Sequence, residues 1–596
     1  MRPAYVALVF SHLAAPYAAA RSVIRYQLDG VVEFRFAALA TVAILISGAL
    51  AFGRLRHQPL RERCTFGSFM IGLWLLVTYA QLVIAVDSAV PRWLLTIAWA
   101  LGMSWVAWLP WGLSFFRWRG FLTGSLLAGL CWAAFWNRFE ITGLTGDARL
   151  EFALRKHQNV PKNHSTLTTN RSVEPGNVLW SGYLGSERSA FVRNGELSDP
   201  WDQHPPVVLW RTSCGSGWSS FAVTDNALFS QEQIPAGIEA NGQAAGSDAI
   251  TCRDPKSGDL IWAVAEDRPG YVSTMGGNGP RATPLLHSLN IGDKERLVVY
   301  GVGPTGMVSC LAADDGTRIW QQDLATLFPG DNLPHGVCAS PVIANDRLIV
   351  CPPSPSGPAM VALDPESGDL LWKSESDWRS SYASPAIFQF GGQIQVVLHA
   401  SPGVMAVDPE TGSLLWSFPW TNEWDNNATQ PLQVPESDTD LIIATGYQGG
   451  AVRLHLQPQG DNTAWTPSVV WETRSTLKTK FCNMAAFGNT VVGLDNGILC
   501  GVDMSSGKRL WKGGRYGHGQ MLRVGSRLLV LEEQGGLQLL QPDAGGHHPI
   551  AQAAALDRKT WNHPVLVKDR LFIRNDQEIM CLQLSAQTSQ GLRPTP

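Results

Sequence analysis

A short phrase that recurs eight times between residues 218 and 566 constrains the fold of this 596-residue chain more than any other feature. In each copy a polar residue, usually followed by proline, opens a short apolar run. The copies begin at Trp218, Arg281, Cys338, Tyr382, Ala428, Phe481, His518 and Trp561, with a mean period of about 49 residues. A fixed period in this range is typical of β-propeller blades, in which the phrase would open the inner strand. The sequence therefore predicts an all-β propeller of eight blades over residues 206–584.

A second phrase closes most repeats, with aspartate and glycine forming a turn and tryptophan four residues after the glycine. Asp254, Gly258 and Trp262 show it in full, and it returns at the pairs Gly316 and Trp320, Gly368 and Trp372, Gly412 and Trp416, and Gly507 and Trp511. Aspartate initiates such a turn, and glycine adopts the positive φ that the turn requires. The indole is a large apolar group. We therefore expect each tryptophan to be buried against the neighbouring blade.

The two ends of the repeat region predict how the ring closes. The strand that ends at Trp210 has no inner strands before it, whereas residues 564–567, 571–574 and 578–582 form three strands with no fourth after them. Completing one blade from both ends would remove the free sheet edges. We expect the two ends of the propeller to share a blade.

The first quarter of the chain is far more apolar than the rest. Residues 34–53, 67–86, 93–116 and 121–137 are stretches of membrane-spanning length that are nearly free of charge, so about four transmembrane helices are predicted within residues 34–138. Arginines crowd the first and third connecting loops, which the positive-inside rule assigns to the cytoplasm. The propeller would then lie on the extracytoplasmic side of the membrane.

Three further segments complete the predicted organisation. Residues 1–33 form an N-terminal segment, which is either an interfacial helix or an extra span. Residues 139–205 form an extracytoplasmic linker that contains the lead-in to the propeller. Residues 585–596 form a disordered tail.

Charge and cysteine usage exclude several classes of function. The net charge of −4 is made of interspersed signs, so no clustered basic face is expected and nucleic acid is not a predicted partner. The ten cysteines include no C-x-x-C pair, which argues against a zinc ribbon, a redox dithiol and a c-type haem. Cys252, Cys310, Cys500 and Cys581 recur at one position of different repeats, where we expect them to be buried in the core.

The turn-plus-tryptophan phrase, repeated over residues 206–584, resembles the tryptophan-docking repeats of propellers related to pyrroloquinoline quinone (PQQ) enzymes. That superfamily contains quinoprotein alcohol dehydrogenases and the propeller lipoprotein of the outer-membrane barrel assembly machinery. The segment from Trp180 to Val192 resembles the lead-in phrase of bacterial PQQ-like repeat proteins. The resemblance implies a bacterial inner-membrane protein with either of two functions. One is a binding or assembly module of the cell envelope, and the other is a PQQ-dependent dehydrogenase that oxidises an alcohol or sugar and reduces quinone.

Aligning the eight inner phrases separates two rings of side chains. The residues one position before the proline are all polar, and we call them the polar ring: Ser220, Thr283, Ser340, Ser384, Gln430, Asn483, Gln520 and His563. The residues three positions before it vary, and they are those that begin the phrases. Because a strand has a period of two, both sets lie on one strand face near the propeller axis. The polar ring is expected to satisfy backbone groups between blades.

The varied ring is the better candidate for function, because it mixes aromatic and basic residues with Lys480 one position before Phe481. These side chains would line the opening of the propeller at its axis, which we call the axial mouth. An opening with aromatic and basic walls suits a flat anionic ligand or the edge of a peptide partner. The candidate ligand- or cofactor-binding residues are Trp218, Arg281, Tyr382, Lys480, His518, Trp561 and His563. No catalytic residue and no metal ligand is assigned.

The dehydrogenase alternative would place PQQ and calcium at this mouth. The segment from Trp424 to Asn427 could supply oxygen ligands. Asp495 with Asn496 could do so too, although Asp-Asn before Gly497 also reads as an ordinary turn. The alcohol dehydrogenase branch has a disulfide between adjacent cysteines, and this sequence has no adjacent cysteines.

Overall fold

The computed structural model describes residues 139–144, 150–154 and 172–584, apart from short gaps at 194–196, 198–200, 202–203, 235–245, 274–275, 293 and 461–463. The chain divides into two compact units, residues 1–140 with 153–156 and residues 141–152 with 157–596. Strands β1 (Phe139–Leu144) and β2 (Leu150–Leu154) pair in a two-stranded sheet. The predicted transmembrane helices, the segment 1–33 and the tail 585–596 lie outside the described residues.

Within the described residues, no helix has the length and apolarity needed to cross a membrane. The only helix there is the short α6 (Leu324–Leu327), for which Asp323 is the N-cap.

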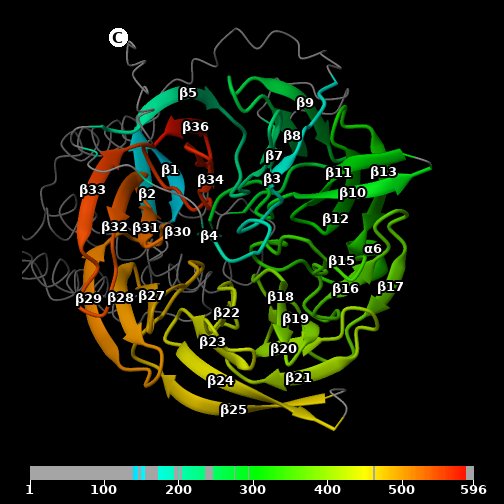
Figure 1. Cartoon of the computed structure of the whole chain (residues 1–596). Helices are drawn as coiled ribbons and strands as arrows, with labels where there is room; N and C mark the ends of the chain where they lie inside the picture. The colour runs from blue at the N-terminus through cyan, green and yellow to red at the C-terminus, as the bar shows by residue number, and fades with distance from the viewer. Residues whose placement is uncertain are drawn as a thin grey trace, which may run out of the picture. The chain divides into compact units, whose positions relative to one another are not determined.

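Eight blades of four strands each form a ring, which confirms the predicted all-β eight-bladed propeller (Figure 1). The strands of blades 1 to 4 run consecutively along the chain. Blade 1 consists of β6 (Ala222–Thr224), β7 (Leu228–Gln233), β8 (Asp248–Arg253) and β9 (Leu260–Ala265). Blade 2 consists of β10 (Leu285–Ile291), β11 (Lys294–Val302), β12 (Met307–Ala312) and β13 (Arg318–Asp323). Blade 3 consists of β14 (Val342–Ala344), β15 (Arg347–Val350), β16 (Val361–Leu363) and β17 (Leu370–Lys373), and blade 4 of β18 (Ala386–Phe390), β19 (Gln393–His399), β20 (Val404–Val407) and β21 (Leu414–Phe418).

Blades 5 to 7 continue the same order. Blade 5 consists of β22 (Leu432–Gln433), β23 (Asp440–Thr445), β24 (Gly450–Gln459) and β25 (Ala464–Thr473). Blade 6 consists of β26 (Ala485–Phe487), β27 (Thr490–Asp495), β28 (Ile498–Asp503) and β29 (Arg509–Arg515). Blade 7 consists of β30 (Gln520–Val524), β31 (Arg527–Leu531), β32 (Gly536–Leu540) and β33 (Pro549–Ala554).

Blade 8 is shared by the two ends of the propeller, as the sequence predicted. Strands β34 (Val565–Val567), β35 (Arg570–Arg574) and β36 (Glu578–Gln583) are completed on the outside by β5 (Val207–Ser213). Trp210 lies opposite Cys581 in this antiparallel pair. The fully buried guanidinium of Arg574 then donates to Ser230 Oγ at 2.8 Å, which ties blade 8 to blade 1.

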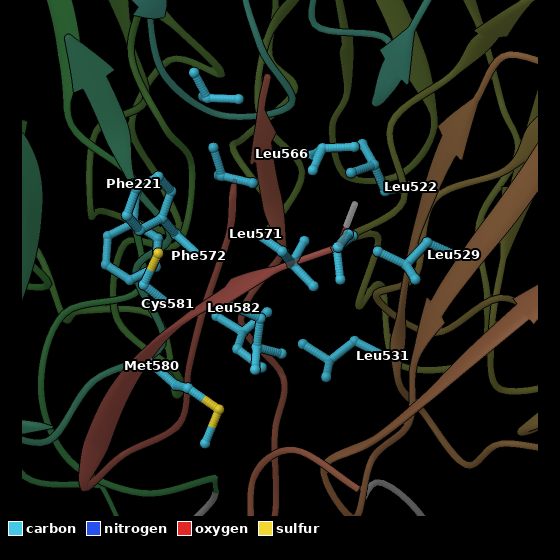
Figure 2. Close-up of a cluster of buried hydrophobic side chains, with 14 of the residues drawn as sticks. Phe221, Leu522, Leu529, Leu531, Leu566, Leu571, Phe572, Met580, Cys581 and Leu582 are labelled. Atoms are coloured by element: carbon cyan, nitrogen blue, oxygen red, sulfur yellow. The ribbon is translucent and has the colours of Figure 1, made fainter. Parts of the chain in front are cut away.

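A hydrophobic cluster fills the space between blades 7, 8 and 1 (Figure 2). Leu522 and Leu529 come from blade 7, Leu571 and Phe572 from blade 8, and Phe221 directly precedes β6 of blade 1. These side chains are almost wholly removed from water. Burial of apolar surface at about 25 cal/mol per Å2 therefore stabilises the joint at which the ring closes.

Indole rings dock each blade on the next. The tryptophan of one blade packs on the turn glycine of the next blade. A Cβ added at that glycine would lie within about 3 Å of the indole ring, so any side chain there would collide with the tryptophan. This holds for five pairs: Trp210 with Gly258, Trp262 with Gly316, Trp320 with Gly368, Trp372 with Gly412, and Trp471 with Gly507. All five glycines have positive φ between 70° and 79°. The expected burial is confirmed for Trp262, Trp320, Trp372 and Trp416, whereas Trp511 is only partly buried.

Four of the five docked indoles also donate a hydrogen bond to the same turn, whereas Trp262 Nε1 has no partner among the described residues. Trp320 Nε1 donates to Pro365 O at 2.9 Å and Trp372 Nε1 donates to Pro409 O at 3.0 Å. Trp416 is an exception, because its Nε1 donates to Gln395 Oε1 within its own blade at 2.8 Å. The four cysteines expected in the core are fully buried and free, and three of them lie opposite a docked tryptophan.

One segment of the predicted linker lies inside the ring, and we call residues 178–192 the axial plug. Its first strand, β3 (Val178–Trp180), pairs antiparallel with β6 of blade 1, and its last, β4 (Phe191–Val192), pairs in parallel with β30 of blade 7. Between them, Ser181 O accepts from the N–H of Leu286 in blade 2. Both added strands lie on the inner side of their blades (Figure 1).

The indole docking predicts different costs for two glycines that both have positive φ. A Cβ added at Gly392 would meet nothing within 4 Å, so a side chain there costs only the strain of the positive φ. We therefore expect Gly392→Ala to lower the free energy of unfolding by about 1 kcal/mol. In Gly368→Ala the new Cβ would also lie 2.6 Å from the Trp320 ring, and overpacking should add about 1–3 kcal/mol. Urea unfolding of the two variants measures the difference. Equal stabilities would contradict the docking.

The shared blade predicts that one outer-strand tryptophan stabilises the whole ring. Trp210→Ala should lower the free energy of unfolding by about 3–5 kcal/mol, because the indole is buried against blade 1. Leu209→Ala is the matched control, since this neighbour is 39% exposed and its truncation should cost about 0.5 kcal/mol or less. Thermal melting of both variants tests this, and a similar small effect for Trp210→Ala would show that β5 does not close the ring.

Candidate functional site

Four aromatic side chains of the varied ring meet at the axis, and we call them the aromatic arc: Phe481, His518, Trp561 and Trp218. The ring centroids of Trp218 and Trp561 are 4.9 Å apart, and those of Trp561 and Phe481 are 5.1 Å apart. Phe481 and His518 follow at 5.7 Å. Each residue opens the inner strand of a different blade, from blade 6 to blade 1. The varied ring therefore forms a continuous aromatic wall over half of the axial mouth.

Two charged side chains that the sequence reasoning missed support this wall. Lys559 Nζ lies 4.6 Å from the ring centroid of Trp561 and 5.4 Å from that of Trp218, a cation–π arrangement. Glu533 accepts hydrogen bonds from Trp561 Nε1 and from the backbone N–H of His518, both at 3.0 Å. Neither residue occupies an aligned position of the repeated phrase, so the repeat gave no signal for them.

Arg281 lies beside the aromatic arc on a loop of glycines. Its guanidinium donates to Gly277 O at 2.9 Å and Gly279 O at 3.0 Å, while Trp218 Nε1 donates to Gly276 O at 2.6 Å. The guanidinium carbon is also 5.5 Å from the ring centroid of Tyr271. The same loop thus positions a cation and an indole.

The other predicted residues occupy the rest of the mouth. Tyr382 makes an edge contact with His335 at 5.1 Å between ring centroids, and burial raises the pKa of its phenol. Lys480 is 8% exposed, and its Nζ lies 5.2 Å from the ring centroid of Tyr447. These contacts are separate from the aromatic arc. The structure therefore brings Trp218, His518 and Trp561 together, and leaves Tyr382 and Lys480 with other partners.

The polar ring links the blades below the mouth. In each case a backbone N–H of one blade donates to a side-chain oxygen of the next. The bonds run from Ser220 to Thr283 (3.0 Å), Thr283 to Ser340 (2.9 Å), Ser340 to Ser384 (2.9 Å) and Gln430 to Asn483 (3.2 Å). Ser220 Oγ completes the connection across the closure by donating to His563 O at 2.5 Å. These side chains satisfy backbone groups between blades, which is the role that the sequence favoured for them.

His563 belongs to this polar ring, below the mouth. It is 3% exposed, and its Nε2 lies 2.9 Å from Met521 O. Burial lowers the pKa of His563 to about 4, so the imidazole is neutral at pH 7. A carbonyl only accepts, hence Nε2 carries the proton. The structure thus places His563 apart from the aromatic arc with which the sequence grouped it.

The axial plug forms the floor beneath the polar ring. Asn483 Nδ2 donates to the hydroxyl of Tyr183 at 3.1 Å, and the Tyr183 and His563 rings lie 6.3 Å apart. Arg188 donates from Nη1 to Pro341 O at 2.9 Å and from Nη2 to Ser340 O at 3.4 Å. The plug touches inner strands on both sides of the axis. The sequence contained this segment as a lead-in phrase but gave no indication of its position.

The proposed oxygen donors for calcium are engaged in turns. Asn427 is fully buried, and its Oδ1 accepts from Thr445 Oγ1 at 2.9 Å and from Asn422 Nδ2 at 3.3 Å. Asp425 pairs with Arg379 at 3.2 Å, and Asp495 pairs with Lys512 at 2.6 Å. Among the described residues, no group of three or more His, Cys, Asp or Glu could hold a metal ion. The aromatic and basic walls suit a flat anion such as PQQ, whereas Asn427, Asp425 and Asp495 are already engaged by other side chains.

Comparisons with known proteins find distant similarities. The family model described as outer membrane protein assembly factor BamB matches residues 246–512. BamB from Moraxella catarrhalis aligns at 15% identity and a TM-score of 0.43, covering 63% of this chain and 99% of that chain. Quinohemoprotein alcohol dehydrogenase from Comamonas testosteroni aligns at 13% identity and a TM-score of 0.44, covering 71% of this chain and 82% of that chain. A comparison with curated proteins gives no match. The fold itself, an all-β propeller of eight blades, is given by the strand pairing of this chain.

The buried imidazole of His563 predicts a pH-dependent stability. Its folded pKa of about 4 lies below the value of about 6.5 in an unfolded chain, so the unfolded state binds more protons between these values. The free energy of unfolding should therefore fall as the pH drops from about 6.5 to about 4, by up to about 3 kcal/mol from this group. In His563→Gln the amide can still donate to Met521 O. Urea unfolding across this range should show a smaller decrease for the variant, and equal pH dependence would contradict a neutral buried imidazole.

Proposed function

We propose that this chain is a membrane-anchored binding or assembly module of the bacterial cell envelope, and that its axial mouth holds a ligand or a protein or peptide partner. The observation that carries the proposal is the aromatic arc with Lys559 against two of its indoles. Aromatic and cationic side chains dominate the energetics of recognition surfaces. A continuous patch of them lies at the point where the blades converge.

Two further features support a role in the envelope. The apolar stretches within residues 34–138 and the arginines between them predict an inner-membrane anchor with the propeller on the extracytoplasmic side. The family model matched by residues 246–512 describes an outer membrane protein assembly factor. This description is the reason for including assembly beside ligand binding in the proposal.

A PQQ-dependent, membrane-bound dehydrogenase is the alternative function. The aromatic arc beside the guanidinium of Arg281 favours it, because this pairing suits a flat anionic cofactor. Such an enzyme would also need oxygen ligands for calcium, and the described donors at Asn427 and Asp495 are already engaged. Binding without turnover is therefore the function that the mouth supports best.

The proposal can be tested by obstructing the mouth, which leaves the aromatic and basic side chains of the mouth in place. Ala428 is the small member of the varied ring, and Ala428→Trp should fill the mouth and abolish the function of the chain in cells. Ala464→Trp is the matched control, because this alanine is exposed on the outer strand β25. Each variant is expressed in a strain that lacks the chain, and the measurement is whether the envelope barrier and growth of that strain recover. Immunoblots check that both variants are present at equal levels.

Two results would contradict the binding-module proposal. If Ala428→Trp restores the strain as well as Ala464→Trp does, the mouth is not the working surface. If the purified protein takes up one equivalent of PQQ with Ca2+ and then catalyses dye-linked oxidation of an alcohol or sugar, the dehydrogenase alternative is correct.

A further inference from the structure

We propose that a pocket between blades 1 and 2 binds the ammonium group of a primary amine, with Glu266 as the anionic partner of that group. We call it the inter-blade pocket. Its polar lining includes Gln231 and Asp248 of blade 1, Glu266 directly after β9, and Ser309 of blade 2. None of these residues belongs to the aromatic arc or to the polar ring, so the inference goes beyond the proposed function of the mouth.

Asp248 and Glu266 bring two carboxyl groups to the same end of the β8–β9 pair. The backbone N–H of Glu266 donates to Asp248 O at 2.8 Å. The Asp248 carboxylate accepts from the backbone N–H of Tyr271 at 2.8 Å and from Gln233 Nε2 at 3.3 Å, which are uncharged donors. Burial raises the pKa of Asp248, and these donors together with the charge of Arg281 offset the effect only in part. The pocket therefore holds two neighbouring carboxyl groups that are largely removed from water.

One oxygen of Glu266 lacks a hydrogen-bond partner. Glu266 Oε2 is buried, and among the described residues no donor bonds to it. Arg268 Nε lies 3.8 Å away, beyond hydrogen-bond reach, and its guanidinium donates instead to Asp323 Oδ2 at 2.9 Å. Arg318, which also lines the pocket, pairs with Asp267 at 3.3 Å. Both neighbouring guanidiniums thus bond to another carboxylate, and Glu266 Oε2 is left as an acceptor for a further cation.

A bound cation would stabilise the ionised form of this enclosed carboxyl group. Burial, and then the Asp248 carboxylate, raise the pKa of Glu266 to about 8, so without a ligand the group is protonated at pH 7. A cation that bonds to Glu266 Oε2 favours the carboxylate and displaces this proton to the solvent. Binding of an ammonium group and release of a proton are therefore linked at Glu266.

The size of the pocket favours an ammonium group over larger cations. Its empty volume of about 310 Å3 includes the opening to solvent, and its enclosed part has room for a group about the size of one water molecule. A primary ammonium group has this size, whereas a trimethylammonium group is far larger. The apolar side chains of Ile250, Val264 and Met307 line the same pocket, where they suit the methylene stem of an aliphatic amine.

Three oxygen acceptors in the pocket match the three N–H groups of a primary ammonium ion. Glu266 Oε2 is the charged acceptor. Gln231 Oε1 lies beside Gly301, since a Cβ added at this glycine would be 2.8 Å from it, and both residues line the pocket. Ser309 Oγ accepts from Gln321 Nε2 at 3.1 Å and keeps a second lone pair. The pocket therefore offers a primary amine both charge and hydrogen-bond partners.

Isothermal titration calorimetry of the purified full-length protein in phosphate buffer tests the ligand class. The probes are n-butylammonium, its uncharged isostere 1-butanol, and butyltrimethylammonium, whose head is too large for the enclosed part of the pocket. We expect n-butylammonium to bind about tenfold more tightly than either of the others, because it alone combines the charge with a small hydrogen-bonding head. This comparison uses the unaltered chain, so it does not depend on the folding of a variant.

The pH dependence of binding tests the linkage to Glu266. Because the amine binds the ionised carboxylate, its affinity should rise by up to about tenfold per pH unit as the pH increases towards about 8. Titrations at pH 7 in two buffers of different ionisation enthalpy should show the release of about one proton per bound amine.

A pair of glutamate variants tests the assigned partner. Glu266→Gln should weaken n-butylammonium binding about tenfold, and it should remove both the pH dependence and the proton release. Glu472→Gln is the matched control, because Glu472 is exposed on the outer strand β25 of blade 5. It should bind all three probes as the unaltered chain does. Thermal melting confirms that each variant is folded.

A lysine derivative separates two sources of the ammonium group. Nα-acetyl-lysine-N-methylamide presents the same butylammonium chain on a peptide backbone. If it binds as tightly as n-butylammonium, the pocket takes the lysine side chain of a protein partner. If n-butylammonium alone binds, the ligand is a free amine.

Several outcomes would overturn the inter-blade pocket as an amine site. They are equal affinities for n-butylammonium and 1-butanol, equal affinities for the primary and the trimethylated amine, an affinity that does not change with pH, and normal binding by Glu266→Gln. Absence of n-butylammonium binding has the same meaning. Each of these leaves the obstruction of the mouth by Ala428→Trp as a separate result.

Discussion

The docking of an indole on the turn glycine of the next blade is the interaction on which the rest of the structure depends. A single blade cannot bury both faces of its sheet, so each blade is stable only when a neighbour covers it. Trp320 over Gly368 shows the arrangement, since no side chain fits between the ring and the backbone. The contact fixes the spacing of successive blades, and repeating it around the axis requires the last blade to meet the first.

Closure of the ring also creates the candidate site. Trp561 and Trp218 lie near opposite ends of the repeat array, yet their ring centroids are 4.9 Å apart because blade 8 is built from both ends of the propeller. The buried Arg574 and the hydrophobic cluster between blades 7, 8 and 1 stabilise the same joint. The aromatic arc therefore depends on the strand pairing that closes the ring, and loss of β5 would disturb both.

The axis is organised in three levels with different chemistry. Aromatic and basic side chains form the mouth, the polar ring below it satisfies the backbones of neighbouring blades, and the axial plug forms the floor. The plug sets the buried cation Arg188 beneath the mouth, on the same side of the axis as Arg281. This separation explains the position of His563. Although it follows Trp561 by only two residues, it belongs to the polar ring, where it bonds to a neighbouring blade, and it takes no part in the aromatic arc.

The number of blades, the docking of Trp262, Trp320 and Trp372, and the shared blade could all be predicted from the amino-acid sequence, because each depends on local turns and strands that repeat with a fixed period. The sequence also separated the polar ring from the varied ring, because residues at the same position of a repeat occupy the same place around the axis. The position of the axial plug and the roles of Lys559 and Glu533 became visible only in the folded chain. These groups occur once and reach the axis by packing between distant blades, and a periodic pattern carries no information about such contacts.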